Sequence, residues 1–282
     1  MFLTGSAILS AGPLLVRLAD VGATQSAFWR LALAIGPLFL FAHLAGRGTP
    51  SRQQPGDWRW LAAGGLFFAA DLACWHLGIL RTTLANSALF ANATSFIYPL
   101  WGFVVARTWP SRRAAGAMVL AAGGIALLMG LSAEVSSRHL IGDLLCLAAA
   151  VFYTGYLVVM DRVRARVAAL SALAQASLYS AIAMLPVALL APGSFWPGDW
   201  TPLLALALGS QVLGQGLIIF ALPKLSPLAS GLGLLIQPVL SATLGVIWFG
   251  EVLSGAEVLG MTAILAALVL VRLPERRQAI ET

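Results

Sequence analysis

The stretch PGDWRWLAAGGLFFAADLACWHLG, residues 55–78, decides the class of fold, because it is an almost continuous apolar run. A helix needs about 20 predominantly apolar residues to cross the hydrocarbon core of a bilayer. The run opens with Pro, Gly and Asp, which are typical of a helix start, and its only carboxylate after that opening is Asp71. We therefore expect this stretch to form a membrane-spanning helix.

The composition of the whole chain agrees with this expectation. Of the 282 residues, 60% are hydrophobic and 10% are charged, and the mean hydropathy is +0.89. Soluble globular domains carry about 25% charged residues, so the composition excludes a soluble fold. At roughly 20 residues for each crossing, the chain has room for about ten membrane helices and almost none for a separate soluble domain.

Apolar runs bounded by charges, Gly and Pro predict an all-α polytopic membrane protein with ten transmembrane helices. The expected helices occupy residues 1–18, 23–44, 57–79, 84–106, 112–130, 139–160, 168–190, 199–221, 226–249 and 255–272.

The basic residues predict the orientation of these helices. The formal net charge is +6, and 13 of the 17 basic residues fall on the side of the N-terminus. They are Arg47, Arg52, Arg59, Arg107, Arg112, Arg113, Arg162, Arg164, Arg166, Lys224, Arg272, Arg276 and Arg277. Cytoplasmic loops carry an excess of Lys and Arg, so we expect both termini in the cytoplasm and a multi-pass protein of a bacterial-type inner membrane. Topology thus explains the positive charge, and we expect no nucleic acid partner.

Two halves of the chain resemble each other. The motif PGDW at 55–58 returns at 197–200, and Pro99 in the fourth expected helix has a counterpart in Pro238 in the ninth. Five crossings is an odd number, so a second copy must be inverted relative to the first, which is a common transporter architecture. We expect a first repeat at 1–130, a connection at 131–138, a second repeat at 139–273 and a cytoplasmic tail at 274–282. Each mid-helix proline should bend its helix.

Charged side chains inside the apolar runs are the strongest candidates for a functional site. A charge at the centre of a bilayer costs roughly 2.5–3.5 kcal/mol on insertion scales, so it needs a partner or a wet cavity. Arg30 and Asp71 lie at similar depths in the outer halves of their helices, and we expect an ion pair. The pair could form a gate or a site for an anionic group, or it could serve packing alone.

Other polar and aromatic residues of the apolar runs are candidates for substrate binding or gating. Gln211 and Gln215 are spaced i, i+4 and should project from one face of a helix. Each candidate has packing or helix linkage as its alternative role. The remaining candidates are Trp75, Asn86, Asn92, Trp101, Tyr153, Tyr156 and Gln237.

The sequence contains no catalytic, metal-binding or nucleotide-binding motif, so we expect no cofactor and no enzyme activity. A polytopic enzyme acting on a lipid-linked substrate remains the alternative, although it would need clustered His, Asp, Glu or Ser residues near an interface. A structural or assembly factor is disfavoured because the loops are too short to dock a partner.

One family resemblance covers nearly the whole chain. The segment QPVLSATLGVIWFGEVLSGAEVLGMTAILAALVLV, residues 237–271, is its most specific part, and FWR at 28–30 and LANSALFANATSFIYPLWGFVVA at 84–106 add to it. These segments resemble the EamA-type family of the drug/metabolite transporter superfamily. The positions that match the family are Arg30, Pro99, Pro238, Gly250 and Glu251.

The resemblance implies ten helices in two inverted five-helix repeats, with a substrate cavity between the halves. It also implies transport of small organic solutes, frequently export. The first half departs from the pattern, since VVARTWPSRRAAG lacks the Gly-Glu pair of the second half. We therefore expect a secondary transporter of a small metabolite or drug-like solute that works by alternating access. Its energy source would be proton coupling or exchange.

Overall fold

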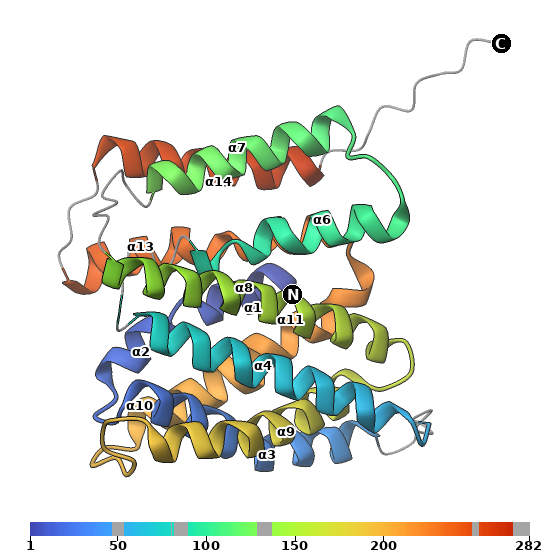
Figure 1. The fold of residues 1–282 in the computed structure, drawn as a ribbon. Helices are drawn as coiled ribbons and strands as arrows, with labels where there is room; N and C mark the ends of the chain where they lie inside the picture. The colour runs from blue at the N-terminus through green and yellow to red at the C-terminus, as the bar shows by residue number, and fades with distance from the viewer. Residues whose placement is uncertain (47–53, 80, 82–89, 129–136, 250–253, 273–282) are drawn as a thin grey trace.

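The computed structural model describes residues 1–46, 54–79, 81, 90–128, 137–249 and 254–272, and these residues form helices joined by short turns (Figure 1). The elements are α1 (Phe2–Leu9), α2 (Gly12–Leu18), α3 (Ala23–Gly46), α4 (Asp57–Ile79), α6 (Thr94–Ala106), α7 (Arg112–Leu128), α8 (Ser137–Arg164), α9 (Ala169–Leu190), α10 (Thr201–Ala205), the π-helix η1 (Leu206–Gly214), α11 (Gln215–Ala221), the 3₁₀ turn η2 (Leu222–Lys224), α12 (Pro227–Leu234), α13 (Ile236–Phe249) and α14 (Gly255–Arg272).

Several of these helices have the length and composition of membrane spans. In the described part of the chain, five segments are long and apolar enough to cross a bilayer: Ala23–Gly46, Asp57–Gly78, Leu140–Arg164, Ala169–Leu190 and Thr201–Lys224. Shorter apolar helices cover Phe2–Val16, Thr94–Ala106, Pro227–Leu240 and Val258–Val271. The chain is therefore a multi-pass, all-helical membrane protein over the residues that the structure describes.

Three of the expected helices are interrupted. The first, expected over 1–18, divides at Ser10, whose hydroxyl donates to the carbonyl of Ala7 at 2.6 Å. The eighth, expected over 199–221, contains the π-helix η1 between α10 and α11. The ninth, expected over 226–249, divides at Leu235, three residues before Pro238, because a proline ring clashes with the carbonyl four residues earlier.

The helices run roughly side by side and stack in successive layers (Figure 1). At one side of the bundle α7 packs on α14, and α6 packs on α12 beside them. The long helix α8 contacts both α6 and α4, and at the other side α4 packs on α9, which packs on α3. The segment of η1 and α11 fills the interior, where it contacts α1, α3 and α9.

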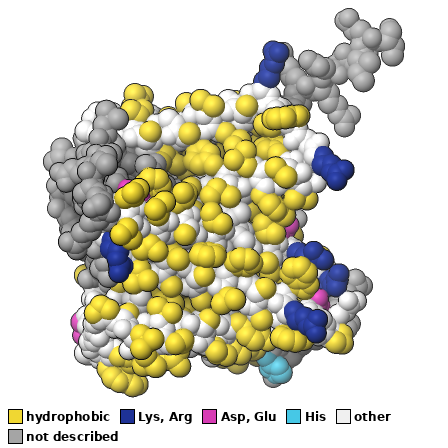
Figure 2. Space-filling model, viewed as in Figure 1, with side chains coloured by type: hydrophobic (Ala, Val, Ile, Leu, Met, Phe, Trp, Pro, Cys, Tyr) yellow, Lys and Arg dark blue, Asp and Glu magenta, His cyan; other side chains and the backbone are white. Residues whose placement is uncertain are grey.

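Two groups of buried apolar residues hold these layers together. The larger group joins α3, α4, α8, α9 and η1, and it includes Leu31, Phe68, Tyr156 and Met160. The smaller group joins α7, α12 and α14 through residues such as Ile125 and Ile264. Apolar side chains also cover most of the side of the molecule seen in Figure 2, while Lys and Arg on this side lie mainly toward the edge where α4 begins.

Small residues allow the central helices to approach closely. The Ser180 hydroxyl on α9 donates to the carbonyl of Gly65 on α4 at 2.8 Å. A Cβ atom at Gly65 would lie 2.5 Å from the Cβ of Tyr179 and 2.8 Å from the carbonyl oxygen of Ala176. Glycine at this position is therefore required for the contact between α4 and α9, as is common where membrane helices pack.

We predict that Gly65→Ala lowers the free energy of unfolding by about 1–3 kcal/mol, because the added methyl group must push α4 and α9 apart. Thermal unfolding of the purified protein in detergent measures this effect. Gly116→Ala is the matched control, because a Cβ atom at Gly116 on α7 has no neighbour within 4 Å. Equal stability of the two variants would contradict the prediction.

Candidate functional site

Arg30 brings a charge into the interior of the bundle. It lies seven residues after the start of α3, about 10 Å along the helix, and it is partly buried. Its Nε donates a hydrogen bond to the side-chain oxygen of Gln211 at 3.1 Å, and its guanidinium lies 5.9 Å from the ring centre of Phe68. The guanidinium thus has one hydrogen-bond partner and one aromatic neighbour, the latter within the range of a cation–π contact.

Gln211 connects Arg30 to the second half of the chain. Its amide nitrogen donates to the hydroxyl of Ser177 on α9 at 3.0 Å, and both side chains are fully buried. Gln211 lies in the π-helix η1, a conformation that is rare and that often occurs at functional sites. We call Arg30, Gln211 and Ser177 the arginine network.

Aromatic side chains line one flank of this network. The ring of Phe68 on α4 stacks on Tyr156 of α8 at 4.7 Å, and Tyr153 lies one turn away, 5.8 Å from Tyr156. The amide of Gln215, at the start of α11, donates to the Tyr153 hydroxyl at 3.4 Å. The buried hydroxyl of Tyr156 makes no hydrogen bond within the described residues. This hydroxyl is therefore able to donate to or accept from another group.

Asp71 lies near the arginine network but does not pair directly with Arg30. It follows Phe68 by three residues and therefore lies on the same face of α4. The charges of Arg30 and Asp71 attract each other, but no nitrogen–oxygen distance of 4.0 Å or less joins them. The structure therefore shows no direct ion pair between these two described residues, and the Nε of Arg30 is bonded to Gln211 instead. Both charged side chains keep some exposed surface.

Three other candidates lie away from the arginine network's hydrogen bonds. Trp75 is on α4, where its ring meets His76 edge-on at 5.0 Å, and Asn92 lies in the turn before α6. Trp101 stacks on Tyr98 of the same helix, α6, at 6.0 Å.

The two prolines and Gln237 lie on α6 and on α13. Helix α6 continues through Pro99, which packs where α12 approaches, since a Cβ atom at Gly231 would lie 2.5 Å from the proline ring. Gln237 and Pro238 lie just after the interruption at Leu235. The remaining residues that the sequence singled out are outside the described residues: Asn86, Gly250 and Glu251.

Sequence reasoning missed Phe68 and Ser177. Phe68 is one of several aromatic residues in an apolar run, and Ser177 is one of several serines on α9. Nothing in the local sequence distinguishes them, because their roles arise from neighbours on other helices.

Long apolar helices that enclose a guanidinium, a carboxylate and two buried amides define a multi-pass membrane protein with a polar interior, as transporters have. Residues 140–273 match the EamA-like transporter family, so this part of the chain carries an EamA domain. The family resemblance that the sequence indicates is confirmed over these residues.

Two curated relatives are similar over part of their length. The chain is 32% identical over 152 residues to the threonine/homoserine exporter RhtA of Salmonella typhimurium (strain LT2) and to that of Escherichia coli (strain K12). The match covers 53% of this chain and 51% of each relative, so the chain spans about half the length of the curated relatives it matches.

A solved crystal structure has the same fold. It superposes with a TM-score of 0.80 at 22% sequence identity, and the match covers 96% of this chain and 95% of the other. The arrangement of helices described above is therefore one that a solved protein adopts.

We predict that Gln211→Leu destabilises the protein by about 1–3 kcal/mol, because it leaves the Arg30 Nε and the Ser177 hydroxyl without their partner. The loss should appear as a lower unfolding temperature in detergent. Gln237→Leu, which changes a partly buried glutamine outside the arginine network, should have a smaller effect. A smaller loss for Gln211→Leu than for Gln237→Leu would contradict this assignment.

Proposed function

We propose that this protein is a secondary exporter of a small amino acid or similar zwitterionic solute across the inner membrane. It works by alternating access of a site between two inverted halves. The observation that carries the proposal is the arginine network, in which Arg30 of the first half bonds to Gln211 of the second half. A charged group held between halves at membrane depth is the usual form of a transporter's substrate site.

The helix contacts support the two inverted halves. Suppose that the first half, which consists of α1 with α2, α3, α4, α6 and α7, corresponds in this order to the second half. The second half then consists of α8, α9, the segment α10–η1–α11, α12 with α13, and α14, and each contact should have a counterpart with the halves exchanged. The contact of α4 with α8 has its counterpart in the contacts of α1 with η1 and α11, and α4 with α9 has one in α3 with η1. Three contacts join equivalent helices of the two halves, so exchanging the halves leaves each of them unchanged: α3 with α9, α6 with α12, and α7 with α14. The same correspondence supports ten crossings, with repeats at 1–130 and 139–273.

The distribution of charge supports an orientation with both termini in the cytoplasm. Lys and Arg lie mainly toward the end of the bundle where α4 begins, and basic residues resist translocation (Figure 2). In this orientation the start of α3 is at the outer face and the start of α4 is at the cytoplasmic face.

The chemistry of the arginine network supports a zwitterionic solute. Gln211 occupies the Nε of Arg30, and in the described part of the chain the two terminal nitrogens make no hydrogen bond, so they can bind a carboxylate in the bidentate geometry typical of arginine. Asp71 lies nearby and has no direct partner among the described residues, and its carboxylate suits an ammonium group. The relatives named as threonine/homoserine exporters carry solutes with both groups.

We predict that Arg30→Gln reduces efflux of labelled threonine from proteoliposomes at least tenfold, because the carboxylate loses a charge-assisted pair of about 1.5–3 kcal/mol. Arg30→Lys should retain part of the activity, since it keeps the charge but not the bidentate geometry. Arg59→Gln is the control, because Arg59 is exposed beside Trp58 at the start of α4. Unchanged efflux in Arg30→Gln would refute this site. If the parent protein transports none of the amino acids tested, the proposed solute class is refuted.

We predict that Asp71→Asn removes the dependence of efflux on a pH gradient if export is coupled to protons, because the amide cannot carry a proton. Efflux is measured with and without an imposed gradient, in parent and variant proteins. A parent protein that responds to external threonine and not to the gradient would indicate exchange. A gradient response that survives in Asp71→Asn would remove Asp71 from the proton path.

A further inference from the structure

At the end of the bundle where α3 begins, the two halves are joined by hydrogen bonds. One carboxylate oxygen of Asp20, in the turn before α3, accepts from the backbone N–H groups of Gly198 and Asp199 at 2.7 and 3.2 Å. The side-chain amide of Gln25 donates to two carbonyls at the end of α9, those of Ala188 and Ala191, at 2.8 and 3.0 Å. We call this set of contacts the Asp20 clasp.

Backbone and aromatic contacts extend the Asp20 clasp. The N–H of Gly22 donates to the carbonyl of Ser194 at 3.2 Å, and the indole N–H of Trp29 donates to the carbonyl of Phe195 at 2.7 Å. The Trp29 ring also lies 5.0 Å from that of Trp200. Close approach is required here, because a Cβ atom at Gly193, whose φ is +120°, would lie 2.7 Å from the Cα of Gly22.

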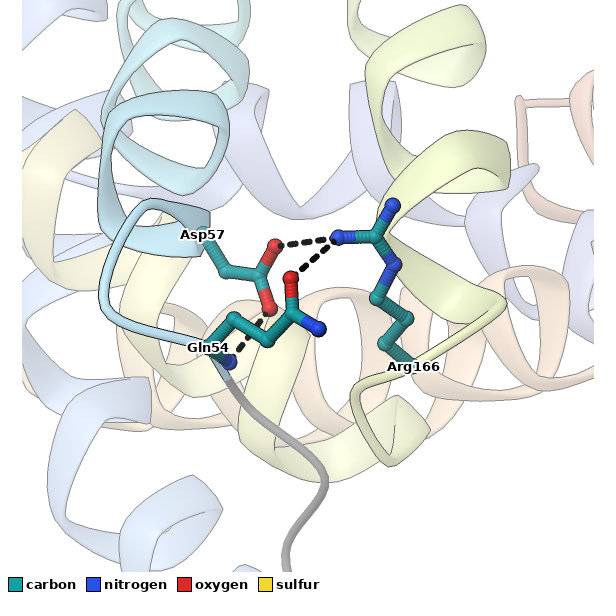
Figure 3. A network of polar contacts seen from close by, with 3 residues as sticks. All are labelled: Gln54, Asp57 and Arg166. Atoms are coloured by element: carbon teal, nitrogen blue, oxygen red, sulfur yellow. Dashed lines mark hydrogen bonds and ion pairs between the residues drawn. The ribbon is translucent and has the colours of Figure 1, made fainter.

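A second set of contacts joins the halves where α4 begins (Figure 3). Arg166, in the turn before α9, donates to the side-chain oxygen of Gln54 at 3.0 Å and lies 3.5 Å from a carboxylate oxygen of Asp57. The other carboxylate oxygen of Asp57 accepts from the N–H of Gln54 at 2.8 Å. We call this set the Arg166 clasp.

The two clasps occupy equivalent places in the two halves. Asp20 lies three residues before the first residue of α3, and Arg166 lies three residues before the first residue of α9. Each holds a copy of the PGDW motif that belongs to the other half, at 197–200 and at 55–58. Each copy of the repeated motif therefore lies where one half of the chain forms polar contacts with the other. Since α3 and α9 run between the clasps, these lie at opposite ends of the bundle (Figure 1).

The clasps differ in strength. The Asp20 clasp combines a carboxylate on two backbone amides with three further hydrogen-bonding groups and an aromatic cluster. The Arg166 clasp depends on one arginine whose side chain is 51% exposed, although Asp57 is only 8% exposed. The Asp20 side chain is exposed as well, so the clasps differ in the number of their contacts and in the burial of Gln25. Ion pairs with an exposed partner contribute little and weaken in salt.

We propose that the Asp20 and Arg166 clasps are the outer and cytoplasmic gates of the transport cycle, and that the weaker Arg166 clasp opens first. This assignment rests on the proposed export function and orientation, in which solute enters from the cytoplasm. An exporter has to open toward the cytoplasm before it holds solute, and a weaker cytoplasmic gate favours that order.

Hydrogen–deuterium exchange of the full chain in lipid nanodiscs, without solute, tests the gates separately from transport. Arg166→Gln should speed exchange of the amides at 57–60 and 166–169 by about 2- to 5-fold, as expected for loss of one exposed ion pair. The amides at 22–25 and 194–199 should not change. Asp20→Asn should have the reverse pattern, with a larger effect of about tenfold because two amides lose a charged acceptor. Added NaCl should speed exchange only at the Arg166 clasp.

Two control variants separate a gate from a general loss of charge. Arg162→Gln removes a charge at the same end as Arg166, but Arg162 stacks on Trp60 at 4.2 Å outside the clasp. Asp199→Asn removes a carboxylate beside Asp20. In the described part of the chain the Asp199 side chain accepts a hydrogen bond from Thr201 and takes no part in the clasp, and this bond holds the pKa of Asp199 below its usual value. Each control variant should speed exchange less than the clasp variant at the same end, and neither should change exchange at the opposite end. Arg166→Lys should keep most of the protection from exchange that Arg166→Gln loses.

Acceleration confined to the end that carries the substitution supports the gates. Three outcomes would overturn the assignment of the gates. They are equal acceleration of exchange at both ends, no acceleration in Arg166→Gln and Asp20→Asn, and control variants that act as strongly as the clasp variants. Because exchange is measured without solute, failure of the threonine assay leaves this result unaffected.

Discussion

A guanidinium inside an apolar bundle has to be satisfied by other protein groups, and the interior of this molecule is arranged around that requirement. Among the residues that the structure describes, Arg30 has one hydrogen bond, to Gln211, and an aromatic neighbour in Phe68. Gln211 in turn is held by Ser177. Since these residues come from four separate segments, the charge can be accommodated only when α3, α4, α9 and η1 are assembled together.

Close helix packing makes that assembly possible. Gly65 lets α4 approach α9, and a Cβ atom at Gly5 on α1 would lie 2.6 Å from the carbonyl of Gly214 at the end of η1. Between lipid-facing helices there is little hydrophobic driving force, so contact area and interhelical hydrogen bonds have to supply the stability. The small residues, which allow close contact, and the buried polar groups, which form the interhelical hydrogen bonds, therefore stabilise the bundle together.

Much of this arrangement is readable from the sequence. The apolar runs locate the helices because a bilayer imposes a fixed length, and Arg30, Gln211 and Gln215 are conspicuous because polar groups are expensive in an apolar run. Partners are harder to predict. Depth along a helix placed Arg30 near Asp71, but only the assembled bundle shows that Gln211 takes the nearer position. Periodicity also locates an apolar run without showing the helix interruptions at Ser10 and Leu235 within it.

The π-helix η1 adds a property that a uniform α-helix would lack. A π-helix bonds each N–H to the carbonyl five residues earlier, whereas the adjoining α10 and α11 use the carbonyl four residues earlier. Any change of that bonding pattern within 206–214 would turn Gln211 about the helix axis relative to Gln215. The direction in which Gln211 points toward Arg30 is thus set by the backbone bonding of this short segment, and not only by the positions of the helices on either side.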